Sequence, residues 1–449
     1  MKVGISFVIG LAALVNYATA QQTQTLSLQQ AIQIALEKNV QVIQAQSSVD
    51  AAGGRVLAAY GNYLPTLTAS GNWNRNQNDQ ASAITQSFGG GTFVTPASFS
   101  VTNSFSTGIS LNYTVFDGFN REAGFNSAKS IAQSSEDKSL RTRQTVTNQV
   151  ESAYLNVLRL EQLVKVADEN LKRDRRQLER ITESNKVGAT ALADVYRQQS
   201  TVAQDELLEI NAQNDYDKAR ADLVALAGLD LGTEYQFSDP SISTTIDQAE
   251  LDSTLSKYSN LSQLSQRALE ARPDYIAARE DLHSSESGVT QARSGYFPSV
   301  SASAGYGLSN NTISNLSDNK NINWGVSIRW NIFDAFRTNQ SLQSAIANQH
   351  SAEAALHQSE RDISVQVKKA SLDLEAARKQ VEVSQKGLVS ATEDHKIAEE
   401  RYNLGAGTLL DLLTANAGLV NAEASNINAI YNYIIAKRNV EYAVGERTY

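Results

Sequence analysis

The sequence predicts an exported α+β membrane protein whose strands form a transmembrane β-barrel and whose long helices form a coiled coil. Three observations predict this fold: an internal two-fold repeat, strands of about ten residues with one apolar face, and two helical segments whose heptad seam continues for about five heptads. The composition is ordinary, with 449 residues of which 41% are hydrophobic and 19% charged. The order of the residues therefore carries the information.

The first twenty residues predict a secretory signal peptide. Lys2 precedes a mostly apolar stretch over 3–15, and Ala18-Thr19-Ala20 fits the small-x-small cleavage rule. The alternative is an N-terminal membrane anchor, but this stretch is too short to span about 30 Å of hydrocarbon. No later segment has eighteen consecutive apolar residues. A chain that is exported and meets a membrane must then do so with strands.

The chain carries an internal duplication. Tyr-Leu-Pro-Thr-Leu-Thr-Ala-Ser at 63–70 matches Tyr-Phe-Pro-Ser-Val-Ser-Ala-Ser at 296–303, which lies 233 residues on. Tyr-Thr-Val-Phe-Asp-Gly-Phe at 113–119 matches Trp-Asn-Ile-Phe-Asp-Ala-Phe at 330–336, which lies 217 residues on. The change of offset places 16 extra residues in the first copy between Pro65 and Tyr113. That segment must tolerate insertion, and we predict surface loops there and in the second copy, at 76–104 and 309–322.

We predict two copies of one unit joined by a linker. Each copy consists of a helix, a β-hairpin, a long helix, a tight tip and a second helix. The predicted segments are the signal peptide 1–20, the first copy 21–228 with its hairpin at about 64–116 and its tip at about 186–190, the linker 229–260, and the second copy 261–449 with its hairpin at about 298–333 and its tip at about 403–408.

The predicted hairpins alternate apolar residues with small or polar ones, which is the period of a strand. The apolar positions of three strands are Ile109, Leu111, Tyr113 and Val115; Val300, Ala302, Ala304, Tyr306 and Leu308; and Trp324, Val326, Ile328, Trp330 and Ile332. The fourth strand, around 67–73, has a weaker pattern. A soluble sheet packed on a helix gives the same alternation, whereas export and aromatics near the strand ends favour a barrel facing lipid outside and water inside.

Two long segments carry a helical period instead. Their apolar positions are spaced four and three apart, with alanine common among them, which predicts close left-handed helix packing. The seam positions are Val146, Val150, Ala153, Val157, Leu160, Val164, Ala167 and Leu171 in the first copy, and Ile363, Val367, Ala370, Leu374, Ala377, Val381, Ser384, Leu388, Ala391, His395, Ala398 and Tyr402 in the second. The first helix, from about Asn120 to Asn185, would run about 100 Å at 1.5 Å per residue. In the first copy the seam is interrupted at Asp174 and resumes at Leu178. Polar faces on both sides of one seam suit the wall of a hollow tube.

Counting the strands predicts an oligomer. Each chain supplies four strands, and four strands cannot close a barrel. An open sheet edge in lipid leaves backbone groups without hydrogen bonds. Two chains would give eight strands, whose interior is filled by side chains, whereas three chains give twelve strands with room for water. A conducting barrel favours the trimer.

Taken together, these residues resemble the TolC-type outer-membrane efflux proteins. The duplicated hairpins, the two Phe-Asp-x-Phe motifs and Arg-Tyr-Asn-Leu-Gly-Ala-Gly-Thr-Leu-Leu-Asp-Leu-Leu at 401–413 carry the resemblance, which covers essentially the whole mature chain. The resemblance implies a homotrimer with a twelve-stranded barrel in outer-membrane lipid on a periplasmic helical tunnel. It also implies an exit duct for drugs or secreted polypeptides, as in type I secretion. Such a duct works with a periplasmic adaptor and an inner-membrane pump of the RND or ABC type.

The resemblance also assigns roles to residues near the two tips. Asp194 and Tyr402 are candidates for a polar tie that closes the periplasmic entrance, and Asp411 for an acidic ring around the threefold axis that attracts cations. Gly188, Gly405 and Gly407 mark the tips that meet the adaptor. The residues themselves allow other roles: Asp194 and Asp411 can stabilise helix N-termini, and Tyr402 lies on the heptad seam.

Three positions depart from the family pattern. Gly407 stands where some relatives have arginine, Ala193 offers no hydroxyl, and Thr414 gives no second acidic ring. These departures indicate that a second tie is missing and that the entrance is leakier or gated differently.

No arrangement of residues predicts catalysis, a cofactor or a metal site. The chain has no cysteine, and its four histidines form no tight ligand motif, although His350 and His357 lie seven apart on one helix. The net charge of −9 argues against nucleic-acid binding. Two functions of other classes stay open: a soluble periplasmic coiled-coil adaptor or scaffold, and a trimeric surface adhesin whose loops bind a partner.

Overall fold

The computed structural model describes residues 24–240, 242 and 245–446, which form two compact units. Unit 1 combines the described residues of 24–44, 142–271 and 363–446, and unit 2 combines 45–141 and 272–362. Each unit draws segments from both predicted sequence copies, because the units follow contacts in space rather than the order of the chain. The predicted signal peptide 1–20 lies outside the described residues.

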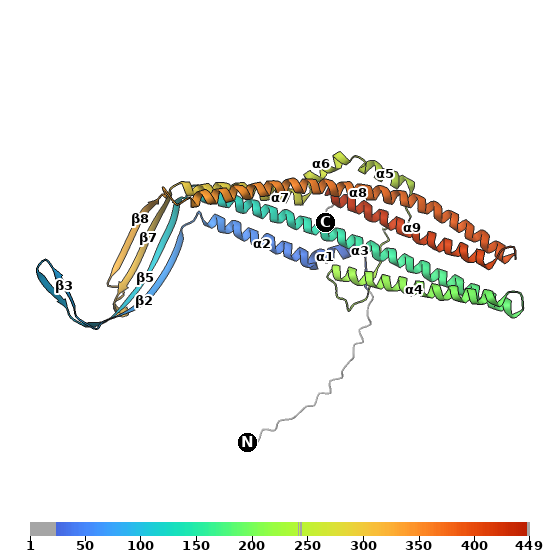
Figure 1. Cartoon of the computed structure of the whole chain (residues 1–449), viewed down its shortest axis with the longest axis horizontal. Helices are drawn as coiled ribbons and strands as arrows, with labels where there is room; N and C mark the ends of the chain where they lie inside the picture. Colours follow the sequence, from blue (N-terminus) through green and yellow to red (C-terminus); the bar gives the residue numbers. More distant parts are fainter. Residues whose placement is uncertain (1–23, 241, 243–244, 447–449) are drawn as a thin grey trace, which may run out of the picture. The chain divides into compact units, whose positions relative to one another are not determined.

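Long helices dominate unit 1, and a sheet with flanking helices makes up unit 2 (Figure 1). In chain order the elements are β1 (Gln24–Leu26), α1 (Leu28–Lys38), α2 (Val40–Gly61), β2 (Thr66–Gln80), β3 (Ile84–Phe88), β4 (Gly91–Thr95), β5 (Ser98–Phe116), α3 (Asn120–Lys186), α4 (Leu192–Leu226), β6 (Tyr235–Phe237), α5 (Gln248–Tyr258), α6 (Leu261–Ala271), α7 (Pro273–Arg293), the 3₁₀ turn η1 (Ser294–Tyr296), β7 (Ser299–Asn310), the 3₁₀ turn η2 (Ile313–Asn315), β8 (Lys320–Arg329), α8 (Arg337–Asn403) and α9 (Leu409–Val444).

The first long helix, α3, has the bounds predicted for it to within one residue, and α8 matches it in length. Helices α3 and α8 each contain 67 residues. Their first residues lie 217 positions apart, and so do the first residues of α4 and α9. The first six predicted seam positions of α8 are buried, namely Ile363, Val367, Ala370, Leu374, Ala377 and Val381. The predicted seam is therefore confirmed over this stretch of α8.

One apolar core of unit 1 lies where α1, α3, α4 and the short parallel pair β1–β6 meet. Val146, Val150 and Val157 of α3 are fully buried in it, as predicted from their spacing. Tyr154 of α3 is also fully buried, and its hydroxyl donates a hydrogen bond of 2.9 Å to the carbonyl of Leu26 in β1. The N-terminal strand is thus fixed to the long helix by both packing and a hydrogen bond.

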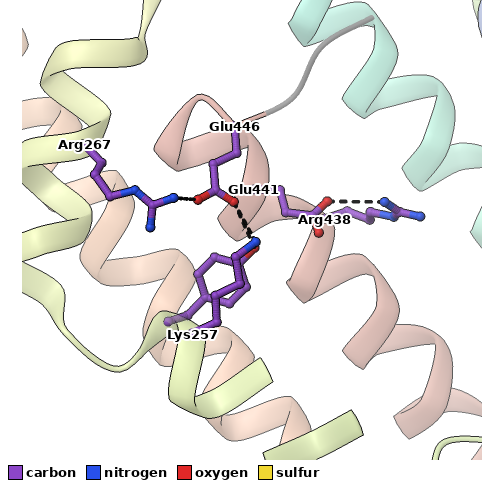
Figure 2. Close-up of polar contacts among 6 residues, drawn as sticks. Lys257, Arg267, Arg438, Glu441 and Glu446 are labelled. Carbon is purple, nitrogen blue, oxygen red and sulfur yellow. Dashed lines mark hydrogen bonds and ion pairs between the residues drawn. The ribbon is translucent and has the colours of Figure 1, made fainter. Parts of the chain in front are cut away.

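Helix α5 of the linker and helix α6 at the start of the second copy are held to the end of α9, also in unit 1, by ionic contacts (Figure 2). The carboxylate of Glu446 accepts a hydrogen bond of 3.0 Å from Lys257 Nζ and one of 3.2 Å from the Tyr258 hydroxyl. Its other oxygen pairs with Arg267 of α6. Although burial opposes it, the hydrogen bond and charge of Lys257 and the charge of Arg267 lower the pKa of Glu446. One carboxylate therefore joins three helices.

Unit 2 contains a four-stranded antiparallel sheet with the strand order β2-β5-β7-β8. Residues paired across strands share a face, so the pairs Leu67↔Leu111, Leu111↔Ala304 and Ala304↔Trp324 run across one apolar face. The other face carries small and polar residues, as in Ser110↔Gly305 and Gly305↔Asn323. The predicted alternation is confirmed in β7 and in β8 as far as Ile328, and in β5 as far as Tyr113. The prediction was wrong for Trp330 and Ile332, which lie beyond the end of β8, and for Val115, where a register shift places Phe116 opposite Val300.

The apolar face of this sheet is exposed. Trp324 is 84% exposed, Ile322 74% and Leu67 71%. Strands β2 and β8 each have a neighbour on one side only, within the residues that the structure describes. Among the described helices, none is long and apolar enough to cross a membrane. The sheet therefore leaves both an apolar face and two edges without partners in one chain.

The two Phe-Asp-x-Phe motifs join each hairpin to a long helix. The Asp117 carboxylate accepts a hydrogen bond from the backbone N–H of Arg121, at 3.2 Å, and the Asp334 carboxylate accepts one from that of Thr338, at 2.8 Å. A carboxylate satisfies the free N–H groups at the start of a helix in this way. Gly118 has φ +69°, and an added Cβ would lie 2.7 Å from the carbonyl oxygen of Ser294, so the first junction requires glycine.

The segment predicted as a loop at 76–104 is more ordered than expected. Strands β2 and β5 extend into it and pair from Thr66↔Asn112 to Gln80↔Ser98, and β3 and β4 form a further hairpin between them. Its turn contains Gly89 and Gly90, both with positive φ. The prediction of a loop over the whole segment was wrong. Backbone hydrogen bonds to a partner strand can extend a strand through polar residues, so the strand continues where the sequence has no apolar alternation.

Candidate functional site

The two tips of unit 1 have the same backbone design. At the end of α3, Gly188 N–H donates to the carbonyl of Asn185 and Ala189 N–H to that of Ser184, both at 2.9 Å. At the end of α8, Gly405 and Ala406 make the equivalent bonds to Tyr402 and Arg401, at 3.0 and 2.8 Å. This pair of bonds is the Schellman motif, whose C′ residue is left-handed. Gly188 and Gly405 have φ of +78° and +73°, so both predicted glycines occupy the position that needs them.

Gly407 has a different requirement. It is not among the glycines with positive φ. An added Cβ would approach Arg401 Cβ at 3.2 Å and the backbone N of Tyr402 at 3.3 Å, which is tighter than ordinary contact. Its own N–H donates to the carbonyl of Arg401 at 3.0 Å. The absence of a side chain here lets the second tip fold closely against the end of α8.

Asp411 belongs to a complete capping box at the start of α9. Its backbone N–H donates to Thr408 Oγ1 at 3.2 Å, and its carboxylate accepts from Thr408 N–H at 3.1 Å. Hydrogen bonds that the Asp411 carboxylate accepts from Thr408, from its backbone N–H first and then from its hydroxyl, lower the pKa of Asp411. The Asp411 side chain is exposed. The carboxylate is therefore charged at neutral pH and lies at the surface of the tip.

Asp194 occupies the matching position of α4 but is held differently. The N-cap residue of α4 is Ala191, which makes no side-chain cap. The Asp194 carboxylate instead accepts a hydrogen bond of 3.1 Å from Arg197 Nη1, one turn further along the helix. The two tips thus share a backbone design but differ in how their acidic residue is fixed.

Tyr402 packs against the apolar cluster that joins the two tips. Ile181, Val195 and Leu409 form this cluster, and Tyr402 lies against it with Leu178 and Leu413. Burial first, and then the charge of Asp194, raises the pKa of Tyr402, while its hydrogen bond to Gln177 opposes the shift. Tyr402 therefore makes the packing contacts that its position on the heptad seam predicts.

The structure brings four of the six predicted tip residues into one cavity of unit 1, and Gly188 and Asp411 are not among its lining residues. Asp194, Tyr402, Gly405 and Gly407 line it, together with Arg180 and Arg197 among others. Sequence reasoning did not select the two arginines. Their positions close to the first tip could have indicated them, but charged residues are frequent along both α3 and α4, so position alone does not distinguish these two arginines. Asp411 is not among the lining residues of this cavity, although Leu409 and Leu410 are.

The histidines lie apart from this site. His350 and His357 are 72% and 60% exposed in α8, and each lies beside a glutamate three residues further on. In the described part of the chain, no group of three or more acidic or histidine side chains could hold a metal ion.

Comparison with known proteins identifies the family. Residues 31–229 and 264–446 match the family of outer membrane efflux proteins. The chain belongs to this family. The match covers the tips, the four-stranded sheet and the long helices that connect them.

Individual relatives agree with this assignment. Over 320 residues the chain is 26% identical to the outer membrane protein TolC of Escherichia coli, covering 68% of this chain and 62% of that protein. It is 21% identical to TolC of Vibrio cholerae over 92% of this chain and 89% of that protein. The crystal structure of the Campylobacter jejuni CmeC outer membrane channel is similar, with a TM-score of 0.77, 20% identity, and coverage of 93% of this chain and 85% of that one.

The comparisons confirm three predictions from the sequence. The resemblance to TolC-type proteins was correct, the location is the outer membrane, and the protein is a channel-family member rather than an enzyme. The solved structure supports the fold of the single chain.

Proposed function

We propose that this chain is one third of an outer-membrane exit duct. Three copies close a twelve-stranded barrel from the four strands of each chain, and the helical hairpins of unit 1 form a periplasmic tunnel. The duct passes small molecules or polypeptides to the exterior, together with a periplasmic adaptor and an inner-membrane pump of the RND or ABC type. The proposal extends the efflux function of the family to this chain.

The observation that carries the proposal is the sheet β2-β5-β7-β8. Its apolar face is exposed, its opposite face is small and polar, and its edges β2 and β8 lack neighbours in the described chain. In lipid, unpaired N–H and C=O groups cost several kcal/mol each, so a sheet with open edges is stable there only after closure. Copies of the same chain supply matching edges, and twelve strands leave an interior wide enough for water.

The tips support the entrance role that we propose for Asp194, Tyr402 and Asp411. Two turns built alike place Asp194 and Tyr402 in one cavity and Asp411 at an exposed helix start. In a threefold assembly, three Asp411 carboxylates would surround the axis and attract cations. The glycines Gly188, Gly405 and Gly407 would present the tips to the adaptor.

Conductance of the purified protein in planar bilayers tests the proposal. We expect channels that multivalent cations block from the periplasmic side, and block that is several-fold weaker in Asp411→Asn. Thr408→Ala is the matched control, because it removes the capping box but keeps the charge. Equal block in the wild type and Asp411→Asn would remove Asp411 from the constriction.

Two further results would overturn the proposed function itself. Recovery of the protein in the soluble periplasm without detergent would support the adaptor or scaffold. Normal drug resistance and secretion in a deletion strain, together with an absence of conductance, would support the adhesin.

A further inference from the structure

A buried polar layer crosses three helices of unit 1. Asn170 and Asp174 come from α3, Gln198 and Asp205 from α4, and Asn416 from α9, and each is at most 7% exposed. Buried carboxyl groups are expensive unless they are hydrogen-bonded, and two of them in one layer repel each other when both are ionised. The layer therefore needs a specific arrangement of donors.

The side-chain amide groups of the layer donate their hydrogen bonds mainly to Asp174. Gln198 Nε2 donates to Asp174 Oδ1 at 2.9 Å and to its backbone carbonyl at 3.1 Å. Asn416 Nδ2 donates to Asp174 Oδ2 at 3.0 Å and to Asn170 Oδ1 at 2.9 Å. Both oxygens of Asp174 are thus satisfied by neutral amides, which stabilise its charged form.

The remaining buried oxygens lack donors. Asp205 Oδ2, Gln198 Oε1 and Asn416 Oδ1 have no hydrogen-bond partner within the described structure. Asp205 lies within hydrogen-bonding reach of the Asp174 and Asn170 side chains. An ionised Asp205 can only accept, so it cannot bond to Asp174. A proton on Asp205 supplies a donor to a neighbouring oxygen of the layer and removes the repulsion.

The charges around the pair favour this state. Burial, then the hydrogen bond and charge of Asp174, raises the pKa of Asp205 to about 7, and the charge of Arg173 opposes the shift. Arg173 also faces Glu423 of α9, with its Nη2 at 3.9 Å from the carboxylate. On α4 itself, the neighbouring Glu206 pairs outward with Arg175 of α3 at 2.8 Å.

The adjoining cavity contributes further charged groups. His395 and Glu399 of α8 line it together with Arg173 and Asp174, and Arg176 and Arg180 of α3 lie along the same wall. No α8 group is among the causes of the pKa shift at Asp205. The proton balance at Asp205 is therefore dominated by α3.

The second hairpin has no equivalent buried polar layer within the described chain. The positions 217 residues beyond Asn170, Asp174, Gln198 and Asp205 are occupied by Gly387, Ala391, Ala415 and Ala422. All four are small and apolar, in helices with the same lengths and turns as their counterparts to within one residue. Only Ala415 of the four is buried, whereas Ala391 and Ala422 are half-buried and Gly387 is exposed. The buried carboxyl groups are therefore a feature of the α3–α4 hairpin alone and not of the repeat.

We propose that this layer is a proton site, in which one exchangeable proton shared by Asp205 and Asp174 controls how tightly α4 packs on α3 and α9. Release of the proton to water leaves two carboxylates in one buried layer, and their repulsion loosens the α3–α4 hairpin beside its tip. Because Asp205 is a buried acid with a raised pKa, its packing is fully favourable below its ordinary range near 3.8 and is progressively lost as the pH rises to about 7. The consequence for a channel rests on the proposed function: the entrance is tighter at acidic pH.

Infrared spectroscopy of the purified full-length protein tests the proton site without any channel assay. We expect a C=O band of a neutral carboxyl group that disappears between about pH 6 and 8 in the wild type and is missing in Asp205→Asn, since a one-unit pH step changes the ratio of the two forms tenfold. Asp222→Asn is the matched control, because Asp222 is an exposed carboxylate of the same helix. A band unchanged in Asp205→Asn, or one that titrates near pH 4, would overturn the proposal.

A second variant keeps the test valid if Asp205→Asn fails to fold. The pair Asp174→Ala and Asp205→Ala gives the first hairpin the residues of the second, and it should fold without the titrating band. Persistence of the band in this variant would assign it elsewhere.

Channel recordings then separate the two proposals. We expect the open probability of wild-type channels to rise several-fold from about pH 6 to about pH 8 and that of Asp205→Asn to stay at its low acidic value. Channels with a pH response that Asp205→Asn leaves intact would overturn the coupling alone. A titrating band in a protein that forms no channels would overturn the proposed function and leave the proton site in place.

Discussion

The two tips offer a paired test of helix capping, because the helix that follows the second tip has an N-cap residue with a side-chain oxygen and the helix that follows the first tip does not. Thr408 caps α9 through its hydroxyl, and its N–H is capped in return by Asp411. Ala191 holds the same place before α4, with extended backbone at φ −71° and ψ 144°, and has no side-chain oxygen. Thr408→Ala should therefore weaken the second tip, and Ala191→Thr should strengthen the first.

The magnitudes follow from the hydrogen bonds at each cap. Thr408→Ala removes the bond from Asp411 N–H, at 3.2 Å, to the hydroxyl, and loss of such a cap costs about 1 kcal/mol. Ala191→Thr creates the same bond, but the gain is roughly 0.5 kcal/mol because Asp194 must give up its exposed contact with Arg197 to complete the box. The helices themselves persist, since each packs along more than thirty residues.

Amide hydrogen exchange at the tips is the appropriate assay, because a helix end opens locally without global unfolding. A change of 1 kcal/mol corresponds to about a fivefold change in exchange rate. We expect the first-turn amides of α9 to exchange about fivefold faster in Thr408→Ala, and those of α4 to exchange about twofold slower in Ala191→Thr. Unchanged rates in both variants would refute the assignment of Thr408 as the cap.

Three further predictions concern other parts of the chain. Glu446→Gln should weaken the contacts of α5 and α6 with the end of α9, which amide exchange at neutral pH would show as faster exchange in both helices. Because the pKa of Glu446 is lowered in the folded protein, the wild type should lose the same protection as the pH falls below about 4.5, while the exchange of the variant should not change over that range. Gly405→Ala should destabilise its tip by about 1 to 2 kcal/mol through positive φ, measured by local exchange, whereas Gly407→Ala should act through contact with the end of α8 and be relieved by a shift of the turn. Val326→Lys on the apolar face of the sheet should reduce insertion by about 2 to 4 kcal/mol in a membrane-folding titration, and Ser327→Lys on the opposite face should not; equal effects would contradict the assignment of the faces.

Much of the fold could be predicted because its helices and strands have clear periods. The spacing of the seam positions Ile363 to Val381 identified the buried face of α8, and the alternation around Trp324 identified the apolar face of the sheet. The hairpin β3–β4 could not be predicted, because its residues carry no apolar period and their pairing depends on the turn at Gly89 and Gly90.

The site could be predicted in part. Gly188 and Gly405 are identifiable from sequence because a helix that ends in a Schellman turn favours glycine. The pairing of Asp194 with Arg197 and the cap at Thr408 could not be predicted. An acidic residue in the first turn of a helix can bond either to the N-cap residue or to a basic side chain one turn further on, and the spacing of the residues does not decide between them. The polar layer was visible only as an interruption of the seam at Asp174, since its partners come from α4 and α9, and the period of one helix does not identify residues on its neighbours.

The number of chains in the particle released from the membrane tests the central claim most directly. Native mass spectrometry of the detergent-solubilised protein gives this number without assuming a fold. Because four strands with two open edges need two further copies to close a water-filled barrel, we predict three chains per particle. A particle of one or two chains would contradict the account.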